Sequence, residues 1–344
     1  QPALSYMLEA LNAGKSVVTA NKDVVASEGK KLLEAAKVNG RDFLYEASVA
    51  GGIPIVRPMK QCLAGNHITE VVGIFNGTTN FILTKMSKEG MEFEEALQLA
   101  QDLGYAESDP TSDIEGLDAG RKVAILASAA FNSRVVFENV YTEGIARITA
   151  KDIQYAKEMG CEIKLLGMAR LTAEGIEARV HPMLINKDHP LASVQDSYNA
   201  VFVRGDAVQD TMFYGRGAGE LPTASAVVGD VFDCVRNILA DCCGRIGCTC
   251  YKDLPIRKIS QIKSKYFVRM EVEDRPGVLA SVTAVFGNNS VSIAQFIQKE
   301  KKGELAEIVV ITEKVQERHF MDAIRILEGM SIIREISSLI RVYG

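Results

Sequence analysis

The first part of the chain alternates between helix-like and strand-like hydrophobic patterns. The predicted elements are a helix at 5–13, a strand at 17–20, a helix capped by Ser27 and ending at Gly40, and a strand at 43–47. This α-β-α-β order predicts one half of an open α/β sheet. Ligands of such sheets bind beyond the carboxyl ends of the strands, so Lys22 and Glu46 are well placed for function.

The middle of the chain is dominated by strand patterns. Predicted strands lie at 68–75, 163–171, 176–185, 200–203 and 208–214, with hairpin turns at 172–175 and 204–207. An amphipathic helix is expected at 93–103, and a nearly apolar one after Lys122. Together these elements predict a mixed or antiparallel sheet with helices on one face.

A third pattern begins at Tyr266, after a linker at 237–265. It reads as a strand, a helix opened by D-R-P-G-V-L at 274–279, strands at 291–298 and 305–311, a helix at 315–327 and a strand at 332–342. The order β-α-β-β-α-β predicts a ferredoxin-like unit.

Composition is that of an ordinary globular protein. The 344 residues allow two or three domains, and a net charge of −5 gives no reason to expect nucleic-acid binding. No apolar run approaches the ~18 residues of a membrane-spanning helix. The first residues read as mid-domain sequence rather than as a signal peptide, so a cytoplasmic location is expected.

Seven cysteines are present, and four of them cluster at Cys242, Cys243, Cys248 and Cys250. Their C-C and C-x-C spacings differ from the C-x2-C of common structural zinc sites. Reduced cytosolic thiols are the favoured interpretation, and whether the cluster binds anything is left open.

The segment from Ala100 to Lys122 carries the most suggestive chemistry. It contains six acidic residues, and Asp118 and Lys122 stand four apart where a helix should begin, on one helical face. Charge pattern alone favours a solvated acidic loop with one ion pair. The same groups could also hold a polar substrate and move a proton. Further along, Y-G-R-G-A-G-E-L-P at 214–222 is either a tight turn or a helix start that attracts anions.

These segments resemble the homoserine dehydrogenases. The family signature A-x3-G-Y-A, D-P, D-I-x-G-x-D-x3-K is filled at every position, and T-A-N-K, N-G-T-x-N and G-A-G before T-A-x-A-V-x-G-D occur in family order. The C-terminal unit resembles an ACT regulatory domain. The resemblance implies the C-terminal half of an NAD(P)-binding Rossmann domain at 1–47, a catalytic and dimerisation domain at 48–236 whose residues 215–236 return to the nucleotide domain, the linker at 237–265, and an ACT domain at 266–344.

The resemblance also implies a reaction and its residues. Family members reversibly reduce L-aspartate 4-semialdehyde to L-homoserine with NADPH or NADH, in threonine, methionine and isoleucine biosynthesis. The implied site comprises catalytic Lys122, Lys22 and Asp113, substrate-binding Glu107 and Asp118, and cofactor-binding Lys22, Gly104 and Gly219. Lys122 would transfer the hydroxyl proton, with Lys22 as the other candidate.

Two further ligands are implied by the family. A structural monovalent cation, usually sodium, would be held by the Glu46 carboxylate and backbone oxygens near Val49, Gly51 and Ile53, although the residues alone favour an ordinary strand-to-helix turn. The ACT domain implies an amino-acid effector, usually threonine, and a homodimer or homotetramer. A unit used only for dimerisation is the alternative.

No G-x-G-x-x-G follows a strand in this chain. The family's first Rossmann elements, including the residue that selects NAD or NADP, are therefore expected upstream of Gln1. A chain beginning at Gln1 is expected to bind a dinucleotide poorly and to be inactive, because that loop holds the phosphates. The competing interpretation is a non-catalytic, amino-acid-sensing dimer, and the missing glycine loop is the feature that separates the two.

Overall fold

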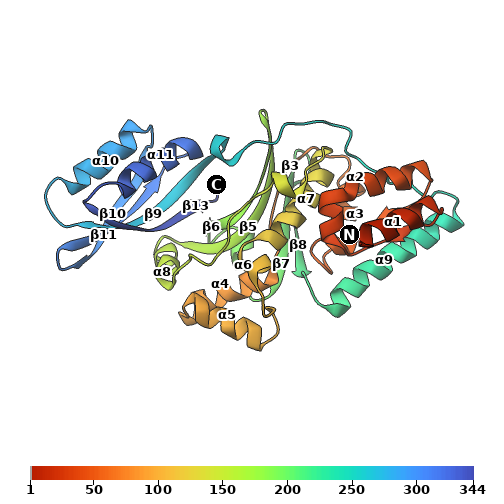
Figure 1. Ribbon diagram of the computed structural model, residues 1–344, viewed down its shortest axis with the longest axis horizontal. Coiled ribbons are helices and arrows are strands. Elements are labelled where there is room, and N and C mark those ends of the chain that lie inside the picture. Colours follow the sequence, from red (N-terminus) through yellow and green to blue (C-terminus); the bar gives the residue numbers. More distant parts are fainter. Residues whose placement is uncertain (1) are drawn as a thin grey trace.

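The computed structural model describes residues 2–344, which form three units along one long axis (Figure 1). The N-terminal elements are α1 (Pro2–Asn12), β1 (Val17–Val18), α2 (Lys22–Val38), β2 (Phe43–Leu44) and α3 (Val56–Lys60). Strands β1 and β2 pair in parallel, as the predicted Rossmann-like half sheet requires. Helix α9 (Glu220–Leu239) returns from far along the chain and lies against β1.

The second helix begins earlier than predicted. Asn21 is its N-cap, and the Asn21 side chain accepts a hydrogen bond from the Val24 N–H. The prediction that Ser27 caps this helix is therefore wrong, since Ser27 lies within it and donates to the Asp23 carbonyl. Lys22 is consequently the first residue of a helix that starts just after β1.

The central unit is built on an antiparallel sheet with the order β6-β5-β3-β7-β8. Its strands are β3 (Ile68–Ile74), β4 (Tyr141–Thr142), β5 (Cys161–Thr172), β6 (Gly175–Asn186), β7 (Tyr198–Gly205) and β8 (Gln209–Arg216). Its helices are α4 (Gly77–Glu89), α5 (Phe93–Asp102), α6 (Thr111–Ile114), α7 (Leu117–Phe131) and α8 (Ala150–Glu158). Both predicted hairpins are present.

Helix α7 lies unusually close to this sheet. A Cβ atom on Gly167 of β5 would lie 2.5 Å from the Phe75 ring and 2.6 Å from Val123. The absence of a side chain at residue 167 thus lets α7 approach the end of β3. This close packing brings the start of α7 to the backbone of Phe75.

The C-terminal unit has the predicted ferredoxin-like topology, with strand order β10-β11-β9-β13. Its elements are β9 (Lys263–Glu273), α10 (Val278–Asn288), β10 (Ile293–Lys302), β11 (Leu305–Thr312), β12 (Val315–Gln316), α11 (Glu317–Glu328) and β13 (Ile333–Val342). A separate apolar core forms between its helices and sheet, around Val268, Met270, Phe286 and Phe320.

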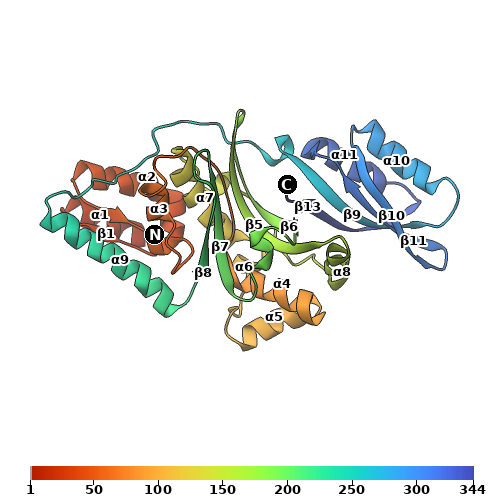
Figure 2. The ribbon, with the colours of Figure 1, turned by 180° about the vertical axis from the view of Figure 1, so that it is seen from behind.

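Strand β13 also pairs in parallel with β6 of the central unit, in the register Arg341↔Met183 and Val342↔Leu184. The two sheets are therefore one continuous eleven-stranded sheet, which Figure 2 shows from behind. The sequence did not predict this joining. Among residues 2–344, no helix is both long and apolar enough to cross a membrane.

Candidate active site

A cavity of about 740 Å³ lies between the N-terminal unit and the central sheet. Its walls come from the segment after β1, the N-terminus of α4, the acidic loop before α7 and the glycine turn before α9. The predicted site residues that line it are Lys22, Gly51, Gly104, Glu107, Asp113, Asp118, Lys122 and Gly219. Segments from four distant parts of the sequence thus meet in one place.

The start of α7 places an acid and a lysine side by side. Gly116 has a φ of +76°, a left-handed conformation that suits glycine, and it leads the chain into the helix. One turn later the Lys122 Nζ lies 2.6 Å from Asp118 Oδ2, and it also donates to the Phe75 carbonyl oxygen at 2.6 Å. Both side chains are buried, with 8% of Lys122 and 5% of Asp118 exposed. The pair is therefore not the solvated surface pair that charge pattern alone favoured.

A second lysine approaches the other oxygen of the same carboxylate. Lys22 Nζ, at the start of α2, lies 3.0 Å from Asp118 Oδ1. Its side chain is 36% exposed, because it borders the open cavity. Asp118 therefore bridges two lysines that come from two different units of the fold.

Asn76 completes the cluster and was not predicted as a site residue. Its side-chain amide donates to Asp113 Oδ1 at 2.7 Å and to Asp118 Oδ2 at 2.9 Å. Its Oδ1 accepts the Thr79 N–H at 2.8 Å and so caps α4. The signal was available, since an asparagine directly after a strand opens the N-G-T-T-N turn. Asp113 thus reaches the lysine cluster through Asn76 rather than by direct contact.

The electrostatic environment of the cluster shifts the pKa values of Asp113 and Asp118 in opposite directions. Burial acts to raise the pKa of Asp118, but Lys122 and Lys22 outweigh it and hold that pKa well below its usual value. Burial and the charge of Asp118 raise the pKa of Asp113. Burial acts to lower the pKa of Lys22, yet the contact with Asp118 raises it overall. Asp118 is therefore the fixed anion of the site.

The cavity also has a wall made of backbone. Gly219 is the N-cap of the twenty-residue helix α9 and has a φ of +117°. A Cβ atom on Gly51 would lie 2.4 Å from the Gly217 carbonyl oxygen, so the two turns touch backbone to backbone. Gly104, with a φ of +74°, follows α5 on another wall. The N-terminus of α9 directs its backbone N–H groups toward this cavity, an arrangement that favours an anionic ligand.

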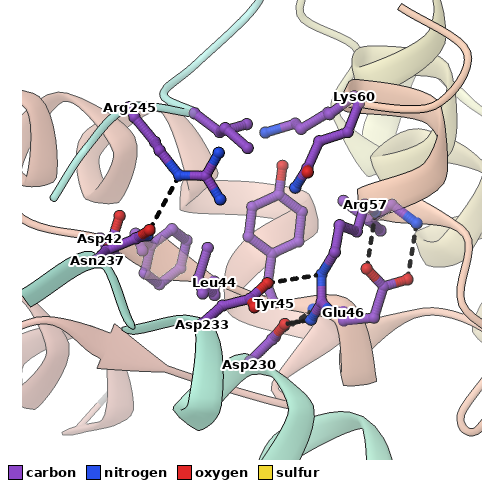
Figure 3. A pocket seen from close by; sticks show the side chains of 14 residues that line it. Asp42, Leu44, Tyr45, Glu46, Arg57, Lys60, Asp230, Asp233, Asn237 and Arg245 are labelled. Atoms are coloured by element: carbon purple, nitrogen blue, oxygen red, sulfur yellow. Dashed lines mark hydrogen bonds and ion pairs between the residues drawn. The ribbon is translucent and has the colours of Figure 1, made fainter. Parts of the chain in front are cut away.

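The predicted cation residues lie beside the cavity, and only Gly51 of the four lines it. The Glu46 carboxylate accepts backbone N–H bonds from Ile55, Val56 and Arg57 at 2.5, 2.8 and 2.7 Å. It thereby caps α3, as Figure 3 shows next to a small pocket bordered by Arg57 and Asp230. Burial raises the pKa of Glu46 although the three donors oppose it. The carboxylate is thus engaged at the helix start.

The cysteine cluster lies outside this cavity. Cys248 accepts a hydrogen bond from Arg134 at 3.4 Å, and Cys250 donates to the Ser128 carbonyl at 3.5 Å. Among the side chains that the structure describes, at residues 2–298 and 303–344, no group of three or more His, Cys, Asp or Glu is arranged to hold a metal ion.

Comparison with known proteins gives consistent matches along the chain. The family profile of homoserine dehydrogenase matches residues 54–232, the profile of the homoserine dehydrogenase NAD-binding domain matches 1–46, and that of the ACT domain matches 266–329. Homoserine dehydrogenase from Bacillus subtilis is 45% identical, over 98% of this chain and 79% of its own. The enzyme from Corynebacterium glutamicum is also 45% identical, over 98% of this chain and 76% of its own.

Solved structures agree. The crystal structure of a homoserine dehydrogenase from Thiobacillus denitrificans superimposes with a TM-score of 0.96 at 42% identity, covering all of this chain and 80% of the other. A hyperthermophilic archaeal homoserine dehydrogenase in complex with NADPH matches with a TM-score of 0.61 at 30% identity, covering 69% of each chain.

Proposed function

The chain belongs to the homoserine dehydrogenase family, and on that premise we propose how its cavity performs the reaction. Enzymes of this family are NAD(P)-dependent oxidoreductases that interconvert L-aspartate 4-semialdehyde and L-homoserine. The ACT domain supports regulatory control. The observation that carries the proposal is the buried carboxylate of Asp118 shared between Lys122 and Lys22.

A nicotinamide cofactor held by Lys22, Gly104 and Gly219 would supply a hydride to the aldehyde carbon. The oxygen of that aldehyde then needs a proton, and we assign its transfer to Lys122, with Lys22 as the second candidate. Two ammonium groups contact the single carboxylate of Asp118, so one of them can give its proton to the aldehyde oxygen. The partner lysine then still balances Asp118, so the carboxylate is never left unpaired.

The acidic residues divide the remaining tasks. Glu107, on the exposed wall of the cavity, would bind the substrate's ammonium group, and Asp118 would hold both lysines close to the hydroxyl. Asp113 would keep the cluster in place through the amide of Asn76. Substrate and proton donor are thereby fixed relative to each other, which is the main requirement for general acid catalysis.

The cofactor would lie along the backbone wall. Lys22, Gly104 and Gly219 would contact it, supported by the N-terminus of α9 at Gly219. NADP and NAD both remain open as the natural cofactor. A structural sodium ion stays a prediction too. It would be held by the Glu46 carboxylate, which also accepts the N–H groups at the start of α3, and by the backbone oxygens near Val49, Gly51 and Ile53. Threonine as effector, a homodimer or homotetramer, and a cytoplasmic location also stay predictions.

The direct test replaces Lys122 by alanine in the enzyme. We expect Lys122→Ala to abolish homoserine oxidation while dinucleotide affinity, measured by fluorescence titration, changes less than about threefold. The matched control is Lys85→Ala, because Lys85 also pairs with a carboxylate four residues away, Glu89, but lies outside the cavity. A wild-type rate in Lys122→Ala would remove the proton-transfer role.

A further inference from the structure

Two cysteines meet where the linker crosses the end of α7, outside the candidate active-site cavity. The Lys252 N–H donates to the Asn132 carbonyl oxygen at 2.8 Å, directly after the last residue of α7. This contact holds the linker against the helix end. The same stretch of linker carries the C-x-C pair Cys248 and Cys250.

The two thiols differ in exposure and in contacts. Cys248 is exposed, whereas Cys250 is half-buried and its Sγ lies 3.5 Å from the Ser128 carbonyl oxygen. The Arg134 guanidinium donates from Nη2 to the Cys248 Sγ at 3.4 Å. The Cys250 thiol also directs a hydrogen bond to Cys248. One sulfur is thus open to solvent beside a cation, and the other contacts it from the protein side.

These contacts favour the thiolate form of Cys248. The charged groups that face it are Arg134, from the segment after α7, and Lys60 of α3, whose Nζ donates to the Gly247 carbonyl oxygen at 3.4 Å. The hydrogen bond from Cys250, together with these two cations, outweighs burial and lowers the pKa of Cys248. The same hydrogen bond, with burial, raises the pKa of Cys250. The pair therefore consists of one thiolate and one thiol that keeps its proton.

We propose that Cys248 and Cys250 form a dithiol site that reacts with small disulfides, with Cys248 as the attacking thiolate and Cys250 as the resolving thiol. The geometry is favourable because two residues span at most about 7 Å of extended chain. A disulfide needs Cα atoms no more than about 6.8 Å apart, so only a slight bend at Thr249 is required. The site is separate from the dehydrogenase cavity, and its test does not depend on enzyme activity.

Glutathione disulfide serves as the oxidant and as the probe. The Cys248 thiolate attacks one of its sulfur atoms, the S–S bond of glutathione disulfide breaks, and a mixed disulfide forms on Cys248. The glutathione thiolate that leaves takes the proton of Cys250. The Cys250 thiolate then attacks the Cys248 sulfur and releases the second glutathione, which takes a proton from water. The cysteine pair is thereby oxidised to a disulfide, and one glutathione disulfide is reduced to two glutathione molecules.

Peptide mapping of the purified protein after incubation with glutathione disulfide at pH 7 tests the site. Trypsin cuts after Arg245 and Lys252, so one peptide carries both cysteines. We expect this peptide from wild type to be two hydrogen atoms lighter. In Cys250→Ser it should instead carry one glutathionyl group on Cys248, because the resolving thiol is gone. In Cys248→Ser the adduct on Cys250 should form at least about tenfold more slowly.

The matched control is Cys62→Ser, since Cys62 is another exposed cysteine and lies just after α3. Its 246–252 peptide should be oxidised within about twofold of the wild-type rate. Addition of glutathione to Cys250 as readily as to Cys248 overturns the assigned roles. An unmodified 246–252 peptide in wild type, under conditions that modify Cys62, overturns the site itself.

The pH dependence of alkylation by iodoacetamide tests the thiolate independently. In Cys250→Ser, the rate at Cys248 should change by less than about threefold between pH 6 and pH 8, because this thiol is already ionised. In a synthetic 246–252 peptide with the same serine, the rate should rise more than about thirtyfold, since a free thiol has a pKa of about 8.5.

The contribution of the guanidinium is tested by adding Arg134→Gln to Cys250→Ser. The rate at Cys248 should then rise with pH at least about fivefold more steeply, as one cation beside the sulfur is lost. Adding Arg236→Gln, at an exposed pair on α9, should leave the profile unchanged. Equal pH profiles in the protein and in the synthetic peptide overturn the proposal, whether or not the Arg134 variant folds.

Discussion

Two cavities lie on opposite sides of the segment that joins Asp113 to Asp118, and each is organised by a buried carboxylate paired with cations. In the active-site cavity Asp118 is held by Lys22 and Lys122. The second cavity, of about 770 Å³, lies between the central unit and the ACT domain and is called here the domain-junction cavity. In it Glu317 is held by both arms of Arg341, which also donates to a carboxylate of the central unit. The two cavities have similar volumes and the two carboxylates are similarly buried, so the difference between the sites is the chemistry of the cation.

That difference separates a reactive site from a fixed one. A lysine ammonium can lose its proton within the range that proteins can tune, whereas an arginine stays charged and binds a carboxylate through a planar fork. The lysine pair therefore suits proton transfer, and Arg341 suits a rigid link between domains. Exchanging the cation type at either site should reveal which property each one needs.

The largest effect is expected for Lys122→Arg, which keeps the positive charge beside Asp118 but cannot release a proton. The kcat for homoserine oxidation should fall by about 10²–10⁴-fold, the usual contribution of general acid–base catalysis. Lys85→Arg, at a surface pair, should stay near the wild-type rate. If Lys122→Arg keeps more than a tenth of that rate, proton transfer belongs to Lys22 instead.

Asp118→Asn should leave two lysines facing each other without a carboxylate. Breaking a buried pair costs about 3–5 kcal/mol of unfolding free energy, and the partial exposure of Lys22 points to the lower end. Because the folded-state pKa of Asp118 is lowered, its stabilisation is full above the ordinary value of about 4 and is lost as pH falls further.

In urea titrations, the difference in unfolding free energy between wild type and Asp118→Asn should therefore be the same at pH 7 and pH 5. It should become smaller below about pH 4. Asp109→Asn, in the exposed part of the same loop, should leave the urea midpoint at pH 7 nearly unchanged. A gap that narrows already between pH 7 and pH 5 would contradict the lowered pKa of Asp118.

Asn76 offers a test of how the two acids are held apart. Asn76→Ala removes the amide that donates to Asp113 and Asp118, and kcat should fall about tenfold, as expected for the loss of hydrogen bonds to a charged group. Asn76→Asp keeps an acceptor for the Thr79 N–H but puts a third carboxylate beside the other two, so its loss should be larger. Equal rates in the two variants would argue against a role in charge positioning.

The smallest effect is expected for Arg341→Lys. This change keeps the charge but loses the two-armed contact with Glu317, so unfolding free energy should fall by about 1–2 kcal/mol. The loss of kcat should stay below about tenfold, far less than for Lys122→Arg. Arg325→Lys serves as the control, because Arg325 forms an exposed pair with Asp322 on α11, the helix that also carries Glu317. A collapse of activity in Arg341→Lys would show that both cavities depend equally on their cation.

Local patterns predicted most of the elements, because hydrophobic periodicity and turn residues act over a few positions. The same range covers the Asp118–Lys122 pair, which is one helical turn long. The sharing of Asp118 with Lys22 joins residues almost a hundred positions apart, and no local signal reports it. The charge pattern predicted a solvated pair, but Asp118 and Lys122 are buried and are contacted by Lys22 of the N-terminal unit and by Asn76 and Phe75 of the central unit.

Other features could not be predicted because they depend on hydrogen-bond partners that only the folded chain brings together. Glu46 stands in the predicted strand at 43–47, and its carboxylate accepts hydrogen bonds from the amides of 55–57 because α3 folds against it. Ser27 was predicted as the N-cap of the second helix, but the Asn21 side chain accepts the Val24 N–H and caps the helix instead. No sequence pattern indicates that β13 pairs with β6, because either strand could equally have formed the free edge of its own sheet.

This pairing governs how the ACT domain can move. Beyond β13, the Tyr343 N–H donates to the Leu184 carbonyl oxygen, and its hydroxyl reaches Glu70 on β3. A domain attached only by residues 237–265 could swing as a rigid body on a tether. Because β13 pairs with β6, the ACT domain can change its orientation relative to the central unit only by altering the twist between these two strands. Regulation of this enzyme would then act as torsion of a single sheet, transmitted along the strands that border the catalytic loop.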